Sequence, residues 1–184
     1  TVLKGKIIPV LRVNTESAAD AMIDFYLNKT SIIDSAVLSS DPAILKKVRK
    51  ALPKIRGVYE ADENTDVKKL PGIANAAYAN TVILTADRAS TDTVAYIQAR
   101  FKTVWVRTAS PDAFSVIDAT ASGAYGVITT DYAAAYAAFA AYPKESLART
   151  SFNVAHRGLP TSKNENSVSG LLAAAKAGAT HVEL

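Results

Sequence analysis

Apolar and polar positions alternate along this chain in blocks that predict strands and helices in turn. Short runs of apolar, often β-branched residues predict strands of a parallel sheet, and the first run is expected to be buried. Helix-start signals such as Asn14-Thr15-Glu16-Ser17 and Ser39-Ser40-Asp41-Pro42 follow some of these runs. The predicted strands are Ile7–Val13, Ser31–Leu38, Ile55–Glu60, Thr103–Thr108, Gly126–Thr129 and Phe152–Ala155, with a last strand at the end of the chain. Thr81–Thr85 is either a further short strand or an arm of the loop before it.

The predicted helices fill the intervals between these strands. They cover about 18–27, 43–52, 72–77, 91–100, 110–121 and 132–142, and a further helix separates the last two strands. A strand and a helix together take roughly 20–30 residues, which predicts an α/β fold with parallel strands and helical crossovers. A parallel (βα)-barrel and an open α/β sheet both fit this rhythm. The lack of a glycine-rich phosphate fingerprint after the first strand favours the TIM-like barrel.

Composition narrows the class of protein. The chain has 184 residues, enough for one good-sized domain, and its 49% hydrophobic and 21% charged residues exclude a disordered polymer. No apolar run approaches the roughly 20 residues of a spanning helix, so we expect a soluble protein. The absence of cysteine excludes disulfides, thiolate metal ligands and a thiol nucleophile. The chain begins without Met or a signal peptide, and an extracytoplasmic or cell-surface location stays open.

Neither the positively charged nor the aromatic residues form a pattern that indicates a binding surface. The net charge is +4, and the densest group of Lys and Arg, at 46–56, lies on or just beyond a predicted helix. No aromatic residues are interleaved with it, which favours a solvated helix face over a nucleic-acid footprint. Tyr132, Tyr136 and Tyr142 lie on an alanine-rich helix, and we interpret their spacing as helix packing.

The densest chemistry lies in the last stretch, Phe152–Leu184. This stretch holds both histidines of the chain, His156 and His181, and it ends with the acidic Glu183 before Leu184. A polar loop opens with His156-Arg157-Gly158 directly after a predicted strand, and Glu183 follows the last one. Parallel barrels keep their sites at the carboxyl ends of strands, so we expect the functional residues here.

The motifs of this stretch resemble the opening of the glycerophosphodiester phosphodiesterase family. They are AHRG, then Glu165-Asn166-Ser167, then a helix and GATHVEL. The family's pattern is HRG, then ENT, then G-A-D-x-x-E-x-D, so Ser167 replaces a threonine and Thr180-His181 departs from the usual Asp-Gly or Asp-Ala. The resemblance implies a TIM-like barrel and the metal-dependent hydrolysis of glycerophosphodiesters, a reaction of lipid metabolism.

The preceding part of the chain resembles later parts of the same family. SAVLSSDPAILKKVRKALP resembles the fifth strand with its helix, and Val104–Gly126 resembles the penultimate strand and its helix, up to the closing strand. The late strands thus come first: 1–143 would be late strands and helices of a degenerate barrel, 144–151 a connection, and 152–184 a first β-α-β unit. Alternatively, 1–184 is one permuted barrel. We expect about seven strands, one βα unit short of a full barrel, which distortion or a homo-oligomer would complete.

The resemblance also implies roles for individual residues. His156 would be a general acid/base, Arg157 would contact the phosphate, and Glu183 would be a ligand of a divalent metal, Ca²⁺ or Mg²⁺. Glu165 and Asn166 would order the loop and cap the helix just outside the site. The partner would be a small-molecule phosphodiester, without nucleic acid and without a membrane span.

Other residues of the family's site have no counterpart here. The second acid of its E-x-D pair would fall at position 185, its third-strand histidine is missing, and Val10–Arg12 contains no glutamate. Arg107 stands where a tryptophan usually precedes Thr108. We therefore expect no hydrolysis by this chain alone, and whether it is an enzyme or binds a metal stays open. The alternative is a non-catalytic surface, scaffold or ligand-binding module, for example for an anionic polymer or a lipid headgroup.

Overall fold

The computed structural model describes residues 7–29, 34–143, 154–158 and 164–183. The chain divides into two compact units, residues 1–143 and 144–184, which are described separately. The predicted connection 144–151 lies outside the described residues, as do Phe152 and Asn153 of the strand predicted after it.

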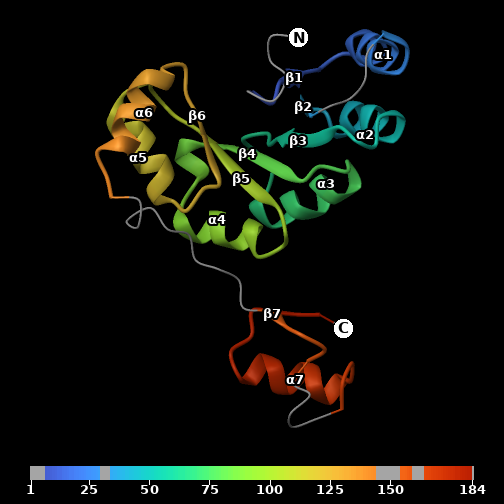
Figure 1. The fold of residues 1–184 in the computed structure, drawn as a ribbon, viewed down its shortest axis with the longest axis vertical. Coiled ribbons are helices and arrows are strands. Elements are labelled where there is room, and N and C mark those ends of the chain that lie inside the picture. Colours follow the sequence, from blue (N-terminus) through green and yellow to red (C-terminus); the bar gives the residue numbers. More distant parts are fainter. Residues whose placement is uncertain (1–6, 30–33, 144–153, 159–163, 184) are drawn as a thin grey trace. The chain divides into compact units, whose positions relative to one another are not determined.

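Strands and helices alternate throughout the first unit (Figure 1). The strands are β1 (Val10–Arg12), β2 (Ala36–Ser39), β3 (Arg56–Glu60), β4 (Thr81–Thr85), β5 (Thr103–Arg107) and β6 (Gly126–Ile128). The α-helices are α1 (Glu16–Asp24), α2 (Pro42–Ala51), α3 (Leu70–Ala76), α4 (Thr91–Gln98), α5 (Ala113–Ala121) and α6 (Tyr132–Ala140). Shorter helical turns are η1 (Phe25–Lys29), η2 (Val67–Lys69) and η3 (Ala86–Arg88).

Local side-chain chemistry sets the starts of the first two helices, as the sequence predicts. The Thr15 hydroxyl accepts a hydrogen bond from the Ala18 backbone N–H at 3.2 Å. The Asp41 carboxylate accepts one from the Ala43 N–H at 2.7 Å, and Pro42 occupies the first helical position. Each cap satisfies a backbone donor that has no partner inside the helix.

The six strands of the first unit form one parallel sheet in sequential order, from β1 to β6. An open doubly wound sheet reverses its strand order at a switch point, and this sheet does not. The sheet curls with its helices into part of a cylinder. The prediction of an α/β fold with an incomplete TIM-like barrel is therefore confirmed.

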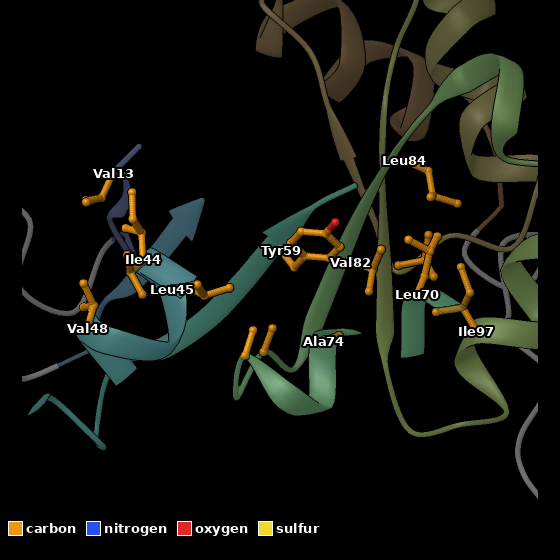
Figure 2. Close-up of a cluster of buried hydrophobic side chains, with 14 of the residues drawn as sticks. Val13, Ile44, Leu45, Val48, Tyr59, Leu70, Ala74, Val82, Leu84 and Ile97 are labelled. Carbon is orange, nitrogen blue, oxygen red and sulfur yellow. The ribbon is translucent and has the colours of Figure 1, made fainter. Parts of the chain in front are cut away.

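Side chains alternate between the two faces of this sheet. One face packs against the helices and forms the main core, in which Leu45 of α2 and Ile97 of α4 are fully buried (Figure 2). The other face forms a smaller apolar cluster made only of strand residues, as expected inside a curled sheet. Its members are Ala36, Leu38, Val58 and Ile83, with Trp105 and Ile128 packed against them.

The first strand differs from its prediction. Ile7–Val13 was expected to be a buried strand, but β1 is shorter, and Val10 and Leu11 are 39% and 40% exposed. The reason is its position, because β1 is the edge of the six-stranded sheet and pairs only with β2 among the described strands. An apolar run predicts a strand, but it does not tell whether a neighbour covers that strand.

The second unit contains a small β-α-β arrangement. Strands β7 (Val154–Ala155) and β8 (His181–Val182) pair in parallel, and α7 (Val168–Lys176) lies between them in sequence. The Ser167 hydroxyl caps α7 by accepting from the Gly170 N–H at 3.0 Å. Gly158 has φ +85°, and a Cβ there would lie 2.9 Å from the carbonyl carbon of Gly170, so this turn requires glycine.

The described parts of the chain contain eight strands, and they include Thr81–Thr85, for which an arm of a loop was the alternative. Six of these strands form the sheet of the first unit, and two pair with each other in the second unit. None of the described helices is long and apolar enough to span a membrane.

Candidate functional site

The parallel pairing of β7 and β8 brings His156 and Glu183 together. Ala155 lies opposite Val182, so the next residue of each strand leaves the sheet at the same edge. The Glu183 N–H donates to the Ala155 carbonyl at 2.9 Å, and the side chains meet in a hydrogen bond between His156 Nδ1 and Glu183 Oε2. The two side chains are 69% and 57% exposed, so the pair is open to solvent and to a ligand.

The loop after β7 joins Arg157 to the Glu165-Asn166 motif. Arg157 Nη1 donates to Glu165 Oε2 at 2.9 Å, and the Asn166 N–H donates to the Arg157 carbonyl at 3.1 Å. Arg157 and Asn166 both have positive φ, 55° and 51°, a conformation that asparagine adopts more readily than arginine. The second unit thus brings the five residues named from the sequence together as two side-chain pairs and a backbone contact.

These residues do not by themselves fit a divalent metal ion. Ca²⁺ and Mg²⁺ take several oxygen ligands, usually from more than one carboxylate. Here the Glu183 carboxylate binds His156, and the Glu165 carboxylate binds Arg157. Within the residues that the structure describes, no group of three or more His, Asp or Glu side chains is placed to hold a metal.

A second polar cluster, which no sequence motif indicated, lies at the carboxyl ends of strands in the first unit. Glu60 ends β3, and it lies between Arg12 at the end of β1 and Arg107 at the end of β5. Arg12 donates to the Glu60 carboxylate through both terminal nitrogens, Nη1 to Oε2 and Nη2 to Oε1, the latter at 2.9 Å. Arg107 Nη2 donates to Oε1 at 2.5 Å. The hydrogen bond from Arg12, more than the one from Arg107, holds the pKa of Glu60 below its usual value against the opposing effect of burial.

A pocket of about 210 Å³ opens beside this cluster. Its walls are the ends of β5 and β6 and the residues that follow them. They comprise Arg107, Thr108, Ala109, Ser110 and Pro111 on one side and Ile128, Thr129 and Thr130 on the other. One cationic side chain and four hydroxyl-bearing residues thus face the same small space.

The tyrosines at 132–142 were expected to pack against neighbouring helices. Tyr142 lies with Phe114 in the wall of another pocket, between α5 and α6, which measures about 300 Å³ and is mainly apolar. Tyr132 and Tyr136 are 84% and 76% exposed, so the interpretation of these two as helix-packing residues was wrong. Ala135 and Ala138 make the buried side of α6 instead.

The comparisons with known proteins agree at the level of fold. No protein-family model and no curated protein matches the chain. A glycerophosphoryl diester phosphodiesterase from Silicibacter pomeroyi DSS-3 has a similar structure, with a TM-score of 0.60 and 15% identity over 72% of this chain and 50% of that protein. One from Agrobacterium tumefaciens C58 gives a TM-score of 0.57 and 16% identity over 68% of this chain and 56% of that protein.

A third similar structure, 3-hexulose-6-phosphate synthase, gives a TM-score of 0.51 and 19% identity over 95% of this chain and 87% of that protein. At these identities the likeness establishes the fold. The chain spans about half the length of the two phosphodiesterases. The resemblance to glycerophosphodiester phosphodiesterases in the sequence is therefore matched by a similar fold.

Proposed function

We propose that this chain is part, or a permuted form, of a glycerophosphodiester phosphodiesterase-like protein. In the complete protein the reaction would be the metal-dependent hydrolysis of glycerophosphodiesters, a step of lipid metabolism. The observation that carries the proposal is the pairing of His156 with Glu183 at the carboxyl ends of two adjacent parallel strands. Arg157 lies in the same loop as His156 and would contact an anionic substrate in place of Glu165.

The geometry of the pair suits proton transfer. Histidine is the side chain that most often acts as a general acid or base, so His156 is suited to protonate the leaving alkoxide of a diester. The Glu183 carboxylate on Nδ1 fixes the orientation of the ring and directs Nε2 away from the pair. Arg157 can offer a planar, bidentate contact to phosphoryl oxygens if it exchanges its contact with Glu165.

The metal-ligand role of Glu183 belongs to the complete protein. A divalent ion there would neutralise charge on the phosphoryl oxygens. One carboxylate is too few ligands, and the described residues contain no group of three or more His, Asp or Glu side chains that could hold a metal. We therefore propose that this chain alone does not hydrolyse such diesters, and that the parent protein adds the missing ligands.

Activity and metal binding test this proposal directly. The purified chain is incubated with glycerophosphocholine and either Ca²⁺ or Mg²⁺, and choline release is measured. We expect no turnover above the background of the His156→Ala variant. The matched control is His181→Ala, which removes the other histidine, within β8. Robust metal-dependent turnover that His156→Ala abolishes and His181→Ala preserves would overturn the prediction of inactivity.

We also propose that the eight strands of the described residues all belong to the same type of barrel. Either residues 1–184 form a single permuted barrel, or 1–143 and 152–184 come from successive barrels and a homo-oligomer completes the structure. Sedimentation at several protein concentrations separates the two. A concentration-independent monomer supports the permuted barrel, and a stable dimer supports completion by a second copy.

A second candidate function is a non-catalytic ligand-binding module. The Arg12–Glu60–Arg107 cluster favours it, because two cations and one anion at the carboxyl ends of strands attract anions and not metal ions. Calorimetric titration with Mg²⁺ and Ca²⁺ discriminates the two functions. A saturable, stoichiometric metal signal that is lost in Glu183→Gln favours the enzyme. Saturable binding of an anion without any metal, lost in Arg107→Gln, favours the binding module.

A further inference from the structure

The pocket at the ends of β5 and β6 has the dimensions of a small ligand. Ligand pockets for drug-sized molecules usually measure about 300–1,000 Å³, and this one measures about 210 Å³. It lies within the first unit, and its residues belong to neighbouring parallel strands and the loops that follow them. The carboxyl ends of parallel strands are the usual location of ligand sites in barrels.

Arg107 provides a cation in the pocket wall with donors to spare. A guanidinium has five N–H donors, and the contact of Arg107 with the described residues uses Nη2, which bonds Glu60. Arg12 already binds both oxygens of Glu60. The carboxylate therefore balances one arginine, and the three-residue cluster retains a net positive charge beside the pocket.

Hydroxyl groups supply further donors around Arg107. Thr129 Oγ1 accepts from the Asp131 N–H at 3.3 Å, which leaves its own proton free to point into the pocket. Thr130 also belongs to the pocket wall, next to Thr129.

Two nearby acids limit what this pocket can bind. The Asp112 carboxylate accepts from the Ser115 N–H at 2.9 Å and the Asp131 carboxylate from the Ala134 N–H at 2.9 Å, so each caps a helix. The positive ends of α5 and α6 offset part of their charge. Their presence disfavours a polyanion, but it leaves room for a single small oxyanion held by Arg107.

We propose that this pocket binds a small oxyanion, such as the phosphoryl group of a phosphate monoester, with Arg107 as its charged anchor. Arg107 grips the anion with its planar fork, and the hydroxyls of Thr129 and Thr130 line the pocket around it. The site lies in the first unit and needs neither His156 nor a metal. It is thus independent of the function proposed for the second unit.

The single tryptophan of the chain reports on this site. Trp105 lies two residues before Arg107, on the same face of β5. Its fluorescence is followed while inorganic phosphate is added at constant ionic strength, with chloride as the matched salt. The same titration is followed by calorimetry, so that binding without a change in fluorescence is still detected. We expect saturable binding of phosphate and none of chloride.

Three variants make the test specific. Arg107→Gln should weaken phosphate binding at least tenfold, and Arg107→Lys, which keeps the charge but not the fork, should weaken it less. The control Arg56→Gln removes one positive charge at the other end of β3, where Arg56 contacts Asp34, and should bind like the wild type. Melting curves by circular dichroism establish that each variant is folded.

The outcomes separate this proposal from its alternatives. Phosphate binding that Arg107→Gln abolishes, and that His156→Ala and Arg56→Gln leave intact, supports it. Equal weakening by Arg56→Gln and Arg107→Gln would show attraction by net charge alone and would overturn it. The absence of saturable binding by both methods would also overturn it, and it would leave the function proposed for the second unit unaffected.

Discussion

Replacing Glu60 by Gln tests whether the Arg12–Glu60–Arg107 cluster stabilises the first unit. The Glu60 side chain is only 19% exposed and accepts hydrogen bonds from both guanidiniums. A hydrogen bond to a charged group contributes about 1.5–3 kcal/mol, whereas an exposed ion pair contributes about 0–1 kcal/mol. The two arginines are more exposed than Glu60 and can turn towards water. We therefore expect Glu60→Gln to lower the free energy of unfolding by about 2 kcal/mol.

Urea unfolding at pH 7, followed by Trp105 fluorescence, measures this loss. A loss of about 2 kcal/mol corresponds to a melting temperature lower by roughly 4–8 °C for a chain of this size. Glu63→Gln is the matched control, because Glu63 is exposed in the loop after β3 and makes no ion pair with a described residue. If Glu60→Gln unfolds within about 0.5 kcal/mol of Glu63→Gln, the cluster does not stabilise the sheet.

The pH dependence of the same variant gives an independent test. The pKa of Glu60 is lower in the folded chain, chiefly because Arg12 donates to its carboxylate. The unfolded chain therefore binds a proton at Glu60 at a higher pH, near the usual value of about 4.3. The stabilisation is fully present above that value and is lost as the pH falls through the lower folded pKa. The difference in free energy of unfolding between wild type and Glu60→Gln should stay constant from about pH 7 to 5 and shrink below about pH 4. A difference that grows as the pH falls would contradict the role assigned to Glu60.

Three further substitutions test the packing. Gly126→Ala places a Cβ 2.8 Å from the Trp105 ring and should cost about 1–3 kcal/mol in urea unfolding. The control Gly72→Ala meets nothing within 4 Å, and a cost as large as that of Gly126→Ala would contradict the steric reasoning. Leu45→Ala empties a fully buried position of the main core and should cost about 2–5 kcal/mol, and a cost below about 1 kcal/mol would show that the core closes around the gap. Gly158→Ala combines a positive φ with a backbone clash, so limited proteolysis should cut the second unit faster than in wild type, and an unchanged rate would refute the strain.

The sequence predicts the elements of this fold well because each one follows from local chemistry. The apolar run Thr103–Thr108 and the Asp41-Pro42 start both appear in the structure close to their predicted positions. The pairing of His156 with Glu183 follows from the same logic, because two residues that leave adjacent parallel strands must lie side by side. The predictions that were wrong concerned burial, which depends on neighbours distant in sequence. The exposure of β1 follows from its place at the edge of the sheet.

The Arg12–Glu60–Arg107 cluster shows why such sites escape sequence reasoning. Each residue is the charged end of an apolar strand, a signal that could have been noticed. The three strands are not neighbours, however, because β2 separates β1 from β3 and β4 separates β3 from β5. Their ends meet only because the sheet curls, and no local pattern specifies that curvature. The interpretation of the α6 tyrosines as packing residues was wrong for a similar reason. The sequence of a helix rich in alanine does not indicate which of its faces is buried.

The charges of the first unit bear on which proposed function applies to it. A hydrolytic metal centre needs carboxylates that are free to bind a cation. Glu60 is the acid at the centre of the cluster, and two arginines already hold it. Binding a metal at Glu60 would require both ion pairs to break and would bring a divalent cation close to two guanidiniums, whose repulsion opposes it. The Arg12–Glu60–Arg107 cluster is therefore better suited to an anion than to a metal ion, which fits the anion site that we propose for the first unit and not a hydrolytic metal centre there.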